Sequence, residues 1–212
     1  MAVIGLNHLV IAPIDTYAAG AEPTYDDGMQ VGHMMKADLS WKHGDAKLHG
    51  DNGLVERDNS ITEGALTVGT THISMAGREM MLGVEKYNTP TTGEVQEYAN
   101  NDEPAPYVGC GYVASDVDDG TEKYIAYWYF KCQFQQDNEN FETKGDSVNY
   151  QTPELVGTIF AVKPDTTGKN KFRKFAEFTT EAAAIAWLDA LAGIGESSGG
   201  GGSGGSGGSG VG

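Results

Sequence analysis

The sequence predicts a mainly β protein with two short helices, and two observations support this fold class. The first is the stretch of residues 123–135, whose side chains alternate between two sets as successive residues of a β-strand do. One set is apolar and mostly aromatic: Tyr124, Ala126, Trp128, Phe130, Cys132 and Phe134. The second observation is that most other segments rich in β-branched and aromatic residues are short and bounded by turn-forming residues. Alternation of this length predicts a strand with one face in a core.

The first half of the chain predicts three further strands. Residues 3–14 form a short apolar segment that ends near Pro13, and residues 60–72 are rich in β-branched side chains. Residues 30–42 alternate apolar and polar side chains. We expect one parity of this segment to share a face: Val31, His33, Met35, Ala37, Leu39 and Trp41.

A long excursion separates the last two of these strands. Residues 43–59 contain three glycines and the turn signal Asp51-Asn52-Gly53. We interpret the segment as a long loop or a ragged hairpin. Excursions of this length in a small domain usually serve a function or bind a partner.

Two segments carry helix signals. At residues 74–83, Ser74 can accept hydrogen bonds from the first free amides and Gly83 suits a left-handed stop. Met75 and Leu82 are expected to share the buried side of this helix, since they lie seven residues apart. A second helix over residues 181–191 is capped by Thr180, and Gly193 and Gly195 end it. Its apolar stripe is Ala184, Trp187, Leu188 and Leu191.

The second half of the chain supplies the other strands. Residues 147–163 are again rich in β-branched and aromatic side chains, and the polar residues 136–146 connect them to the long strand. If the two strands pair directly, they run antiparallel. Other expected elements are a hairpin over residues 87–98, a strand over 106–115, a turn at Asp118-Asp119-Gly120 and a last strand over 172–178.

The chain of 212 residues divides into one domain of ordinary size and a short tail. Residues 1–195 contain every predicted strand and helix. Residues 196–212 are almost entirely glycine and serine, a composition typical of a flexible tail or linker, either engineered or natural.

The charge balance excludes one large class of function. The chain has 14 basic and 30 acidic residues, a net charge of −16, so it does not bind DNA by neutralising phosphates.

Cys110 and Cys132 lie in apolar strand patterns and are expected to be buried free thiols. We expect neither a signal peptide nor a membrane helix, because the N-terminus lacks a basic region and no apolar run is long enough.

No motif predicts a catalytic, cofactor-binding or metal-binding site. Four acids resemble a calcium loop at first sight: Asp116, Asp118, Asp119 and Glu122. A strand follows them where a helix is required, and Tyr127 stands where the last ligand should be, so a plain turn is favoured. The five histidines occur singly: His8, His33, His43, His49 and His72. We therefore expect no enzyme and no cofactor.

Two other functions are compatible with single features of the sequence. The rings of Tyr127 and Tyr129 suit stacking on a sugar, as in a carbohydrate-binding module, although tyrosine is also common at subunit interfaces. Paired carboxylates of a glycoside hydrolase are a third possibility. The acids concerned lie in or beside the polar connection, where solvated acids are the default: Glu139, Glu142, Asp146 and Glu154.

Several of these segments together resemble one protein family. They are Tyr127-Trp-Tyr-Phe-Lys-Cys-Gln-Phe, Glu142-Thr-Lys-Gly-Asp, Asn149-Tyr-Gln-Thr-Pro-Glu-Leu-Val-Gly-Thr, Ile4-Gly-Leu-Asn-His-Leu and Ala105-Pro-Tyr-Val-Gly-Cys-Gly-Tyr. In their order and character they resemble the major tail tube proteins of long-tailed, siphovirus-type bacteriophages. The resemblance extends over about residues 1–193 and includes no catalytic motif.

The resemblance implies a β-sandwich or partly open barrel with one flanking α-helix and a C-terminal helix. It also implies a structural subunit that self-assembles into hexameric rings, which stack into a hollow tail tube in the virion after assembly in the host cytoplasm. DNA passes through the lumen during ejection without specific binding. The implied partners are further copies of the chain, a tape-measure protein, and tail terminator and tip proteins.

Two features of the residues agree with this expectation. An acidic surplus suits a conduit that must not hold DNA, and we expect acidic and small polar side chains to line it. The excursion at residues 43–59 is long enough to reach a neighbouring ring. The runner-up function is a carbohydrate-binding β-sandwich module.

Overall fold

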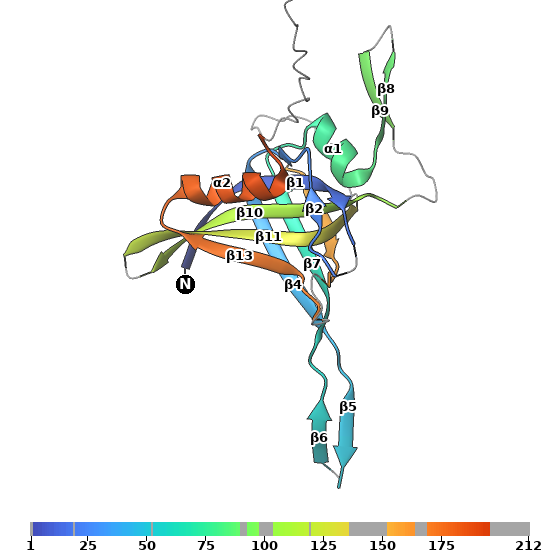
Figure 1. Ribbon diagram of the computed structural model, residues 1–212, viewed down its shortest axis with the longest axis vertical. Helices are drawn as coiled ribbons and strands as arrows, with labels where there is room; N and C mark the ends of the chain where they lie inside the picture. The colour runs from blue at the N-terminus through green and yellow to red at the C-terminus, as the bar shows by residue number, and fades with distance from the viewer. Residues whose placement is uncertain are drawn as a thin grey trace, which may run out of the picture.

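The computed structural model describes residues 2–18, 20–51, 53–89, 93–97, 104–118, 120–135, 152–163 and 169–195. Over these residues the protein is mainly β with two helices, which confirms the predicted class (Figure 1). The elements in chain order are β1 (Ala2–Thr16), β2 (Thr24–Tyr25), β3 (Met29–Gln30), β4 (Met34–His43), β5 (Lys47–Gly50), β6 (Gly53–Arg57), β7 (Ile61–Thr70), α1 (Met75–Leu82), β8 (Glu85–Thr89), β9 (Gly93–Glu97), β10 (Tyr107–Asp118), β11 (Thr121–Gln135), β12 (Glu154–Ile159), β13 (Arg173–Phe178) and α2 (Glu181–Ala192).

One antiparallel sheet of nine strands organises the molecule, in the order β2-β1-β10-β11-β12-β7-β4. Two further strands branch from this path, since β13 pairs with β11 and β3 pairs with β1. The hairpins β5–β6 and β8–β9 form separate two-stranded sheets. The predicted hairpins at residues 43–59 and 87–98 are therefore confirmed, as is the antiparallel pairing of β11 with β12.

The long strand β11 changes partner at a bulge in its middle. It pairs with β13 through residues 124–129 and with β12 through residues 132–135. Opposite it on β10, Cys110 pairs with Tyr129 and Val108 with Cys132, so β11 has one extra residue between these pairs. The backbone groups at the change of partner remain bonded. The Phe130 N–H donates to the Phe172 carbonyl (3.1 Å), the Lys131 carbonyl accepts from the Phe160 N–H (2.8 Å), and the Tyr25 hydroxyl donates to the Phe130 carbonyl (2.6 Å).

The bulge corrects the predicted alternation of β11. Ala126, Trp128 and Phe130 do share a face, which packs under α2. Cys132 and Phe134 lie on the opposite face, in the same cluster as Tyr129. Because side chains alternate with period two, one extra residue moves every later side chain to the other face of the sheet. The prediction of one uninterrupted alternation was wrong for this reason.

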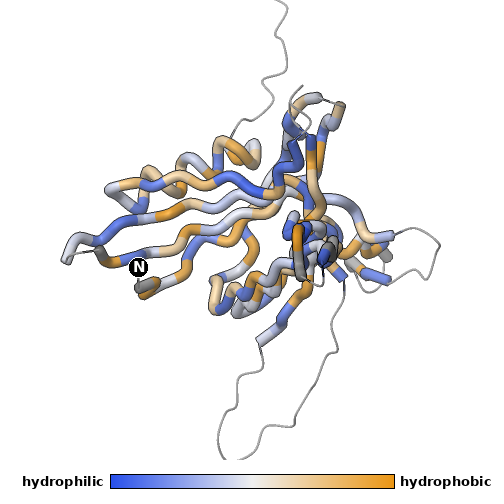
Figure 2. The backbone as a smooth tube through the Cα atoms, turned by 90° about the horizontal axis from the view of Figure 1, so that it is seen from below, coloured by the Kyte–Doolittle hydropathy of each residue, from blue (hydrophilic) through white to orange (hydrophobic). Residues whose placement is uncertain are grey.

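Two apolar cores lie on the two faces of β1, β10 and β11. On one face α2 packs across β10 and β11 (Figure 1), and its Ala184, Leu188 and Ala192 are fully buried. On the other face the strands β12, β7 and β4 and the helix α1 cover the central strands. Both Cys110 and Cys132 are buried and free in this second core, as predicted. Seen along the arm direction, hydrophobic residues follow the central strands and α2 (Figure 2).

Both helices have the predicted caps. The Ser74 hydroxyl accepts from the Gly77 N–H and the Thr180 hydroxyl accepts from the Ala183 N–H. Gly83 and Gly193 take the left-handed conformation at the helix ends.

The burial of α1 and β4 differs from the prediction at two methionines. In α1, Met81 and Gly77 are buried, whereas Met75 is 43% exposed. The helix is only 8 residues long, so its orientation is decided by the neighbours it packs on and not by its own pattern. In β4 a register shift between Met34 and Lys36 turns Met34 inward and leaves Met35 55% exposed.

Candidate assembly surfaces

The hairpin β5–β6 forms an arm that projects beyond the body of the molecule (Figure 1). It continues the β4–β7 pair, in which His43 is the partner of Ile61. Two backbone bonds extend the ladder into the arm: Gly44 N–H to the Ser60 carbonyl and Asp58 N–H to the Ala46 carbonyl, both 2.8 Å. Because paired backbone connects the arm to the sheet, its direction is fixed by the sheet and not by a loose linker.

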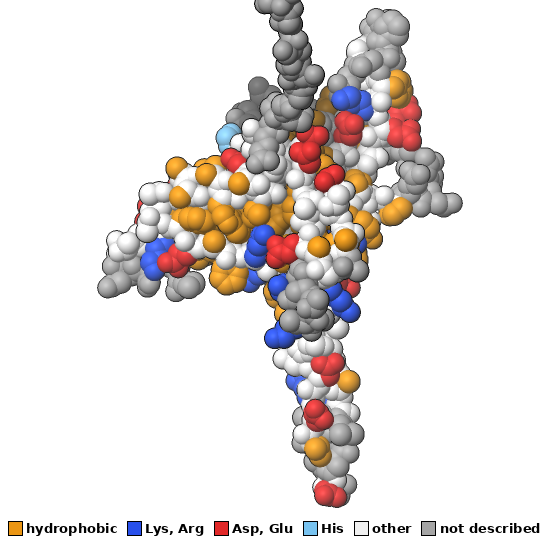
Figure 3. Space-filling model, in the orientation of Figure 1, with side chains coloured by type: hydrophobic (Ala, Val, Ile, Leu, Met, Phe, Trp, Pro, Cys, Tyr) orange, Lys and Arg blue, Asp and Glu red, His pale blue; other side chains and the backbone are white. Residues whose placement is uncertain are grey.

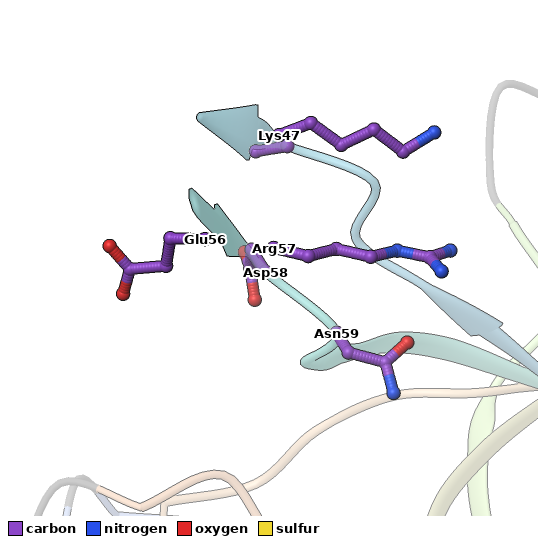
Figure 4. A pocket seen from close by; sticks show the side chains of 6 residues that line it. Lys47, Glu56, Arg57, Asp58 and Asn59 are labelled. Atoms are coloured by element: carbon purple, nitrogen blue, oxygen red, sulfur yellow. The ribbon is translucent and has the colours of Figure 1, made fainter. Parts of the chain in front are cut away.

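A triad of charges occupies one side of this arm. Lys47 and Arg57 are direct partners across the two strands. This arrangement is unfavourable because two positive charges face each other. Asp45 lies 3.1 Å from both of them and compensates the repulsion. Figure 4 shows the Lys47 and Arg57 side chains directed to the same side, while Glu56 points away from them.

A hollow of about 460 Å³ lies beside this triad (Figure 4). Its lining residues are all exposed: Ala46, Lys47, Glu56, Arg57, Asp58 and Asn59. The Ser60 N–H donates to Asp58 and holds the pKa of that carboxyl below its usual value. Because its described lining residues are all exposed, the hollow is open to solvent.

The outer edges of the large sheet are a second surface suited to a neighbouring chain. β4 ends the sheet on one side, and β13 pairs only with β11, so each presents one unpaired edge among the described strands. Large apolar side chains are exposed on both: Met35 on β4 is 55% exposed and Phe175 on β13 is 64% exposed. Unpaired edges of this kind can pair with another chain.

An arginine fixes the start of β13 against β4. The Arg173 guanidinium lies within 6 Å of four ring centroids: Tyr127 (5.1 Å), Trp41 (5.7 Å), Phe175 (5.8 Å) and Tyr129 (5.9 Å). Its Nη1 also donates to the Tyr129 hydroxyl at 3.4 Å. Burial raises the pKa of Tyr129, so the phenol stays neutral. Through these contacts, Arg173 holds the β13 edge in a fixed position relative to β4.

The same contacts cover the two tyrosines of β11 that were considered for sugar binding. Tyr129 is fully buried, and Tyr127 is half-buried with its ring 5.9 Å from Phe175. Neither presents a free flat surface to a sugar. Among the described residues, the exposed aromatic side chains are Tyr17, Tyr87, Tyr107 and Phe175.

Lys131 lies over two of these exposed rings, Tyr107 and Tyr17. Its ammonium lies 3.9 Å from the Tyr107 ring centroid and 5.5 Å from that of Tyr17. Sequence reasoning missed this cluster because its members come from three separate segments and carry no common motif.

The residues considered for metal binding or catalysis do not come together. Asp116 is buried in β10, whereas Glu122 is exposed at the start of β11. Within the described part of the chain, no three His, Cys, Asp or Glu side chains form a group that could hold a metal ion. Glu154 binds Lys36 at 3.2 Å. The other three candidates for a carboxylate pair lie outside the described residues: Glu139, Glu142 and Asp146.

Neither comparison with known proteins finds a match: no protein-family model matches the chain, and no curated protein does. In the described residues, neither helix has the length and apolarity needed to span a bilayer. Part of the segment that resembles tail tube proteins, residues 136–151, lies outside the described residues, as does the Gly/Ser-rich stretch 196–212. The candidate surfaces for function are therefore the arm and the two outer edges of the sheet.

Proposed function

We propose that the protein is a structural subunit of a phage tail tube, which assembles with copies of itself into stacked rings around a lumen for DNA. The observation that carries the proposal is an open sheet joined to a projecting arm. Among the described strands, β4 and β13 each present an unpaired edge, and β5 and β6 of the projecting arm pair only with each other. Surfaces of this kind are complete only when other chains cover them.

The proposal includes the finer description of the fold. We propose that the nine-stranded sheet forms the β-sandwich of a tail tube protein, with α2 on its outside. The resemblance of residues 1–193 and the mainly β architecture support this assignment. In such an assembly the outer edges of the sheet meet within a ring, and the arm reaches the next ring.

Removal of the arm tests this function. Deleting residues 47–57 removes the separate sheet β5–β6 and leaves the cores intact, because none of these residues belongs to either core cluster. Folded subunits are expected that no longer form tubes. Electron microscopy and light scattering of concentrated protein give the readout, with far-UV circular dichroism to check folding. Normal tubes from the shortened chain, or a full-length chain that stays monomeric at every concentration, would refute the proposal.

A carbohydrate-binding module remains the second candidate to be tested in the same samples. Its support from Tyr127 and Tyr129 is lost, since Tyr129 is buried and Tyr127 is half-covered. A glycan array with the full chain separates the two functions. Specific glycan binding by a chain that stays monomeric would favour the module.

A further inference from the structure

Basic and acidic residues are distributed very unevenly along this acidic chain. Residues 163–174 contain five of the 14 basic residues and only one acid, Asp165. Residues 75–103 contain six acids and two basic residues. The basic segment therefore has a net charge of +4 and the acidic segment a net charge of −4.

The described residues of the two segments lie at opposite ends of the molecule (Figure 1). The basic segment lies at the root of the arm, where Lys171 pairs with Val162 and the Phe172 ring is 5.5 Å from Trp41 of β4. The acidic segment contains α1 and the hairpin β8–β9, which stand at the end away from the arm (Figure 1). Figure 3 shows Lys and Arg side chains gathered where the arm meets the body, and Asp and Glu side chains gathered over α1 and the β8–β9 hairpin.

The acidic end has two carboxylates that repel each other. Glu85 and Glu97 are direct partners across β8 and β9, and both are exposed. Like charges directly opposite in a hairpin destabilise it. Glu97 accepts a hydrogen bond from the Tyr87 hydroxyl (2.6 Å), but in the described part of the chain neither glutamate has a cationic partner. The nearby Lys86 binds Glu79 instead, at 3.4 Å.

The basic end has the opposite excess. We define the basic collar as Lys163 and Lys169. Lys163 and Lys169 are exposed, and no acid among the described residues binds either of them. Other lysines of the described chain do bind acids: Lys36, Lys42, Lys47, Lys86, Lys123 and Lys174. Lys163 and Lys169 are therefore available to bind acids of another copy.

We propose that the collar of one copy binds the Glu85–Glu97 pair of the next copy, so that copies stack head to tail along the direction of the arm. This inference rests on the proposed function, because it names the contact by which stacked copies recognise each other. The contact is heterologous, since two different surfaces of the same chain meet, and such contacts propagate into open stacks. Each copy supplies the charges that the next one lacks, and complementary potentials fix orientation and speed up encounter.

Charge reversal tests the contact. The variant E85K/E97K and the variant K163E/K169E should each assemble at least about tenfold less readily than the parent, because like charges then meet at the contact. The chain with all four substitutions has both ends reversed and should regain assembly. A control is E122K, which also reverses an exposed acid but lies at the start of β11, away from both ends and from the sheet edges β4 and β13. It should assemble as the parent does, apart from a general effect of net charge.

Light scattering and electron microscopy measure assembly, and circular dichroism checks the fold of every variant. Recovery in the fourfold variant supports the proposal. Parent-like assembly of both double variants, or no recovery in a folded fourfold variant, overturns it while leaving the proposed function standing. If a double variant does not fold, the salt dependence of the parent decides: assembly that weakens as salt rises supports the contact, and assembly indifferent to salt overturns it. A parent chain that never assembles removes the proposed function as well.

Discussion

The His8 Nε2 atom lies 2.7 Å from Asp189 Oδ1, and this contact fastens α2 to a bulge of β1. The register of β1 shifts between Asn7 and Val10, and His8 takes a positive φ of 55° there. The bulge turns His8 towards the helix, where its side chain is only 11% exposed. The preceding Asn7 donates to Glu181 at the start of the same helix. One irregularity in a strand thus positions the layer that covers the sheet.

Substitution of His8 by alanine should lower the free energy of unfolding by about 1–2 kcal/mol, since a partly buried hydrogen bond to a carboxylate is lost. The matched control is His33→Ala, because His33 is exposed and its side chain makes no contact of this kind. Urea unfolding of the two variants and of Asp189→Ala measures the effect. A loss that is equally large in His33→Ala would show that the contact to α2 is not its cause.

The bulge of β11 gives a second prediction. The Tyr25 hydroxyl donates to the Phe130 carbonyl, which the change of partner strands would otherwise leave without a donor. Tyr25→Phe should therefore cost about 1–3 kcal/mol of unfolding free energy, the usual cost of an unsatisfied buried carbonyl. Tyr107→Phe is the matched control, since Tyr107 is 41% exposed. Equal stability of the two variants would mean that water replaces the hydroxyl.

The same bulge shows where sequence reasoning stops. Helix caps such as Ser74 and Thr180 are local signals, and they predicted both helix starts. The arm followed from the glycines and the turn signal in residues 43–59. The bulge depends instead on Gly109 and Tyr25, which meet β11 only after folding: a Cβ on Gly109 would approach both Trp128 and Tyr25 to 2.5 Å. Alternation within one strand contains no information about such partners.

The candidate surfaces were predictable to a similar degree. The arm was expected as a contact between copies. The exposure of Tyr127 and Tyr129 was misjudged, because Arg173 and Phe175, which cover them, come from a strand more than forty residues later in the chain. The basic collar belongs to a run of cations that is visible in the sequence. Its position at the root of the arm required the structure.

Alkaline pH should destabilise the protein. Burial raises the pKa of the Cys110 thiol from 9.0 to about 12, and burial also raises the pKa of Cys132. The folded state then keeps protons that the unfolded state releases, so stability falls as the pH rises from about 9 towards 12. The urea midpoint should decline steadily over this range, and thiol reagents should modify neither cysteine until the chain unfolds. A constant midpoint, or rapid modification of the folded protein, would contradict this expectation.

The outer edge of β13 provides a test that separates assembly from stability. Phe175 is 64% exposed, so its replacement by serine should change the free energy of unfolding by no more than about 1 kcal/mol. If this edge meets another copy, Phe175→Ser should nevertheless reduce assembly strongly, because the partner loses an apolar contact next to paired backbone. Tyr17→Ser, at another exposed aromatic position, is the control that should still assemble. Light scattering at matched concentrations compares the two variants, and equal assembly would place the contact between copies on a different surface.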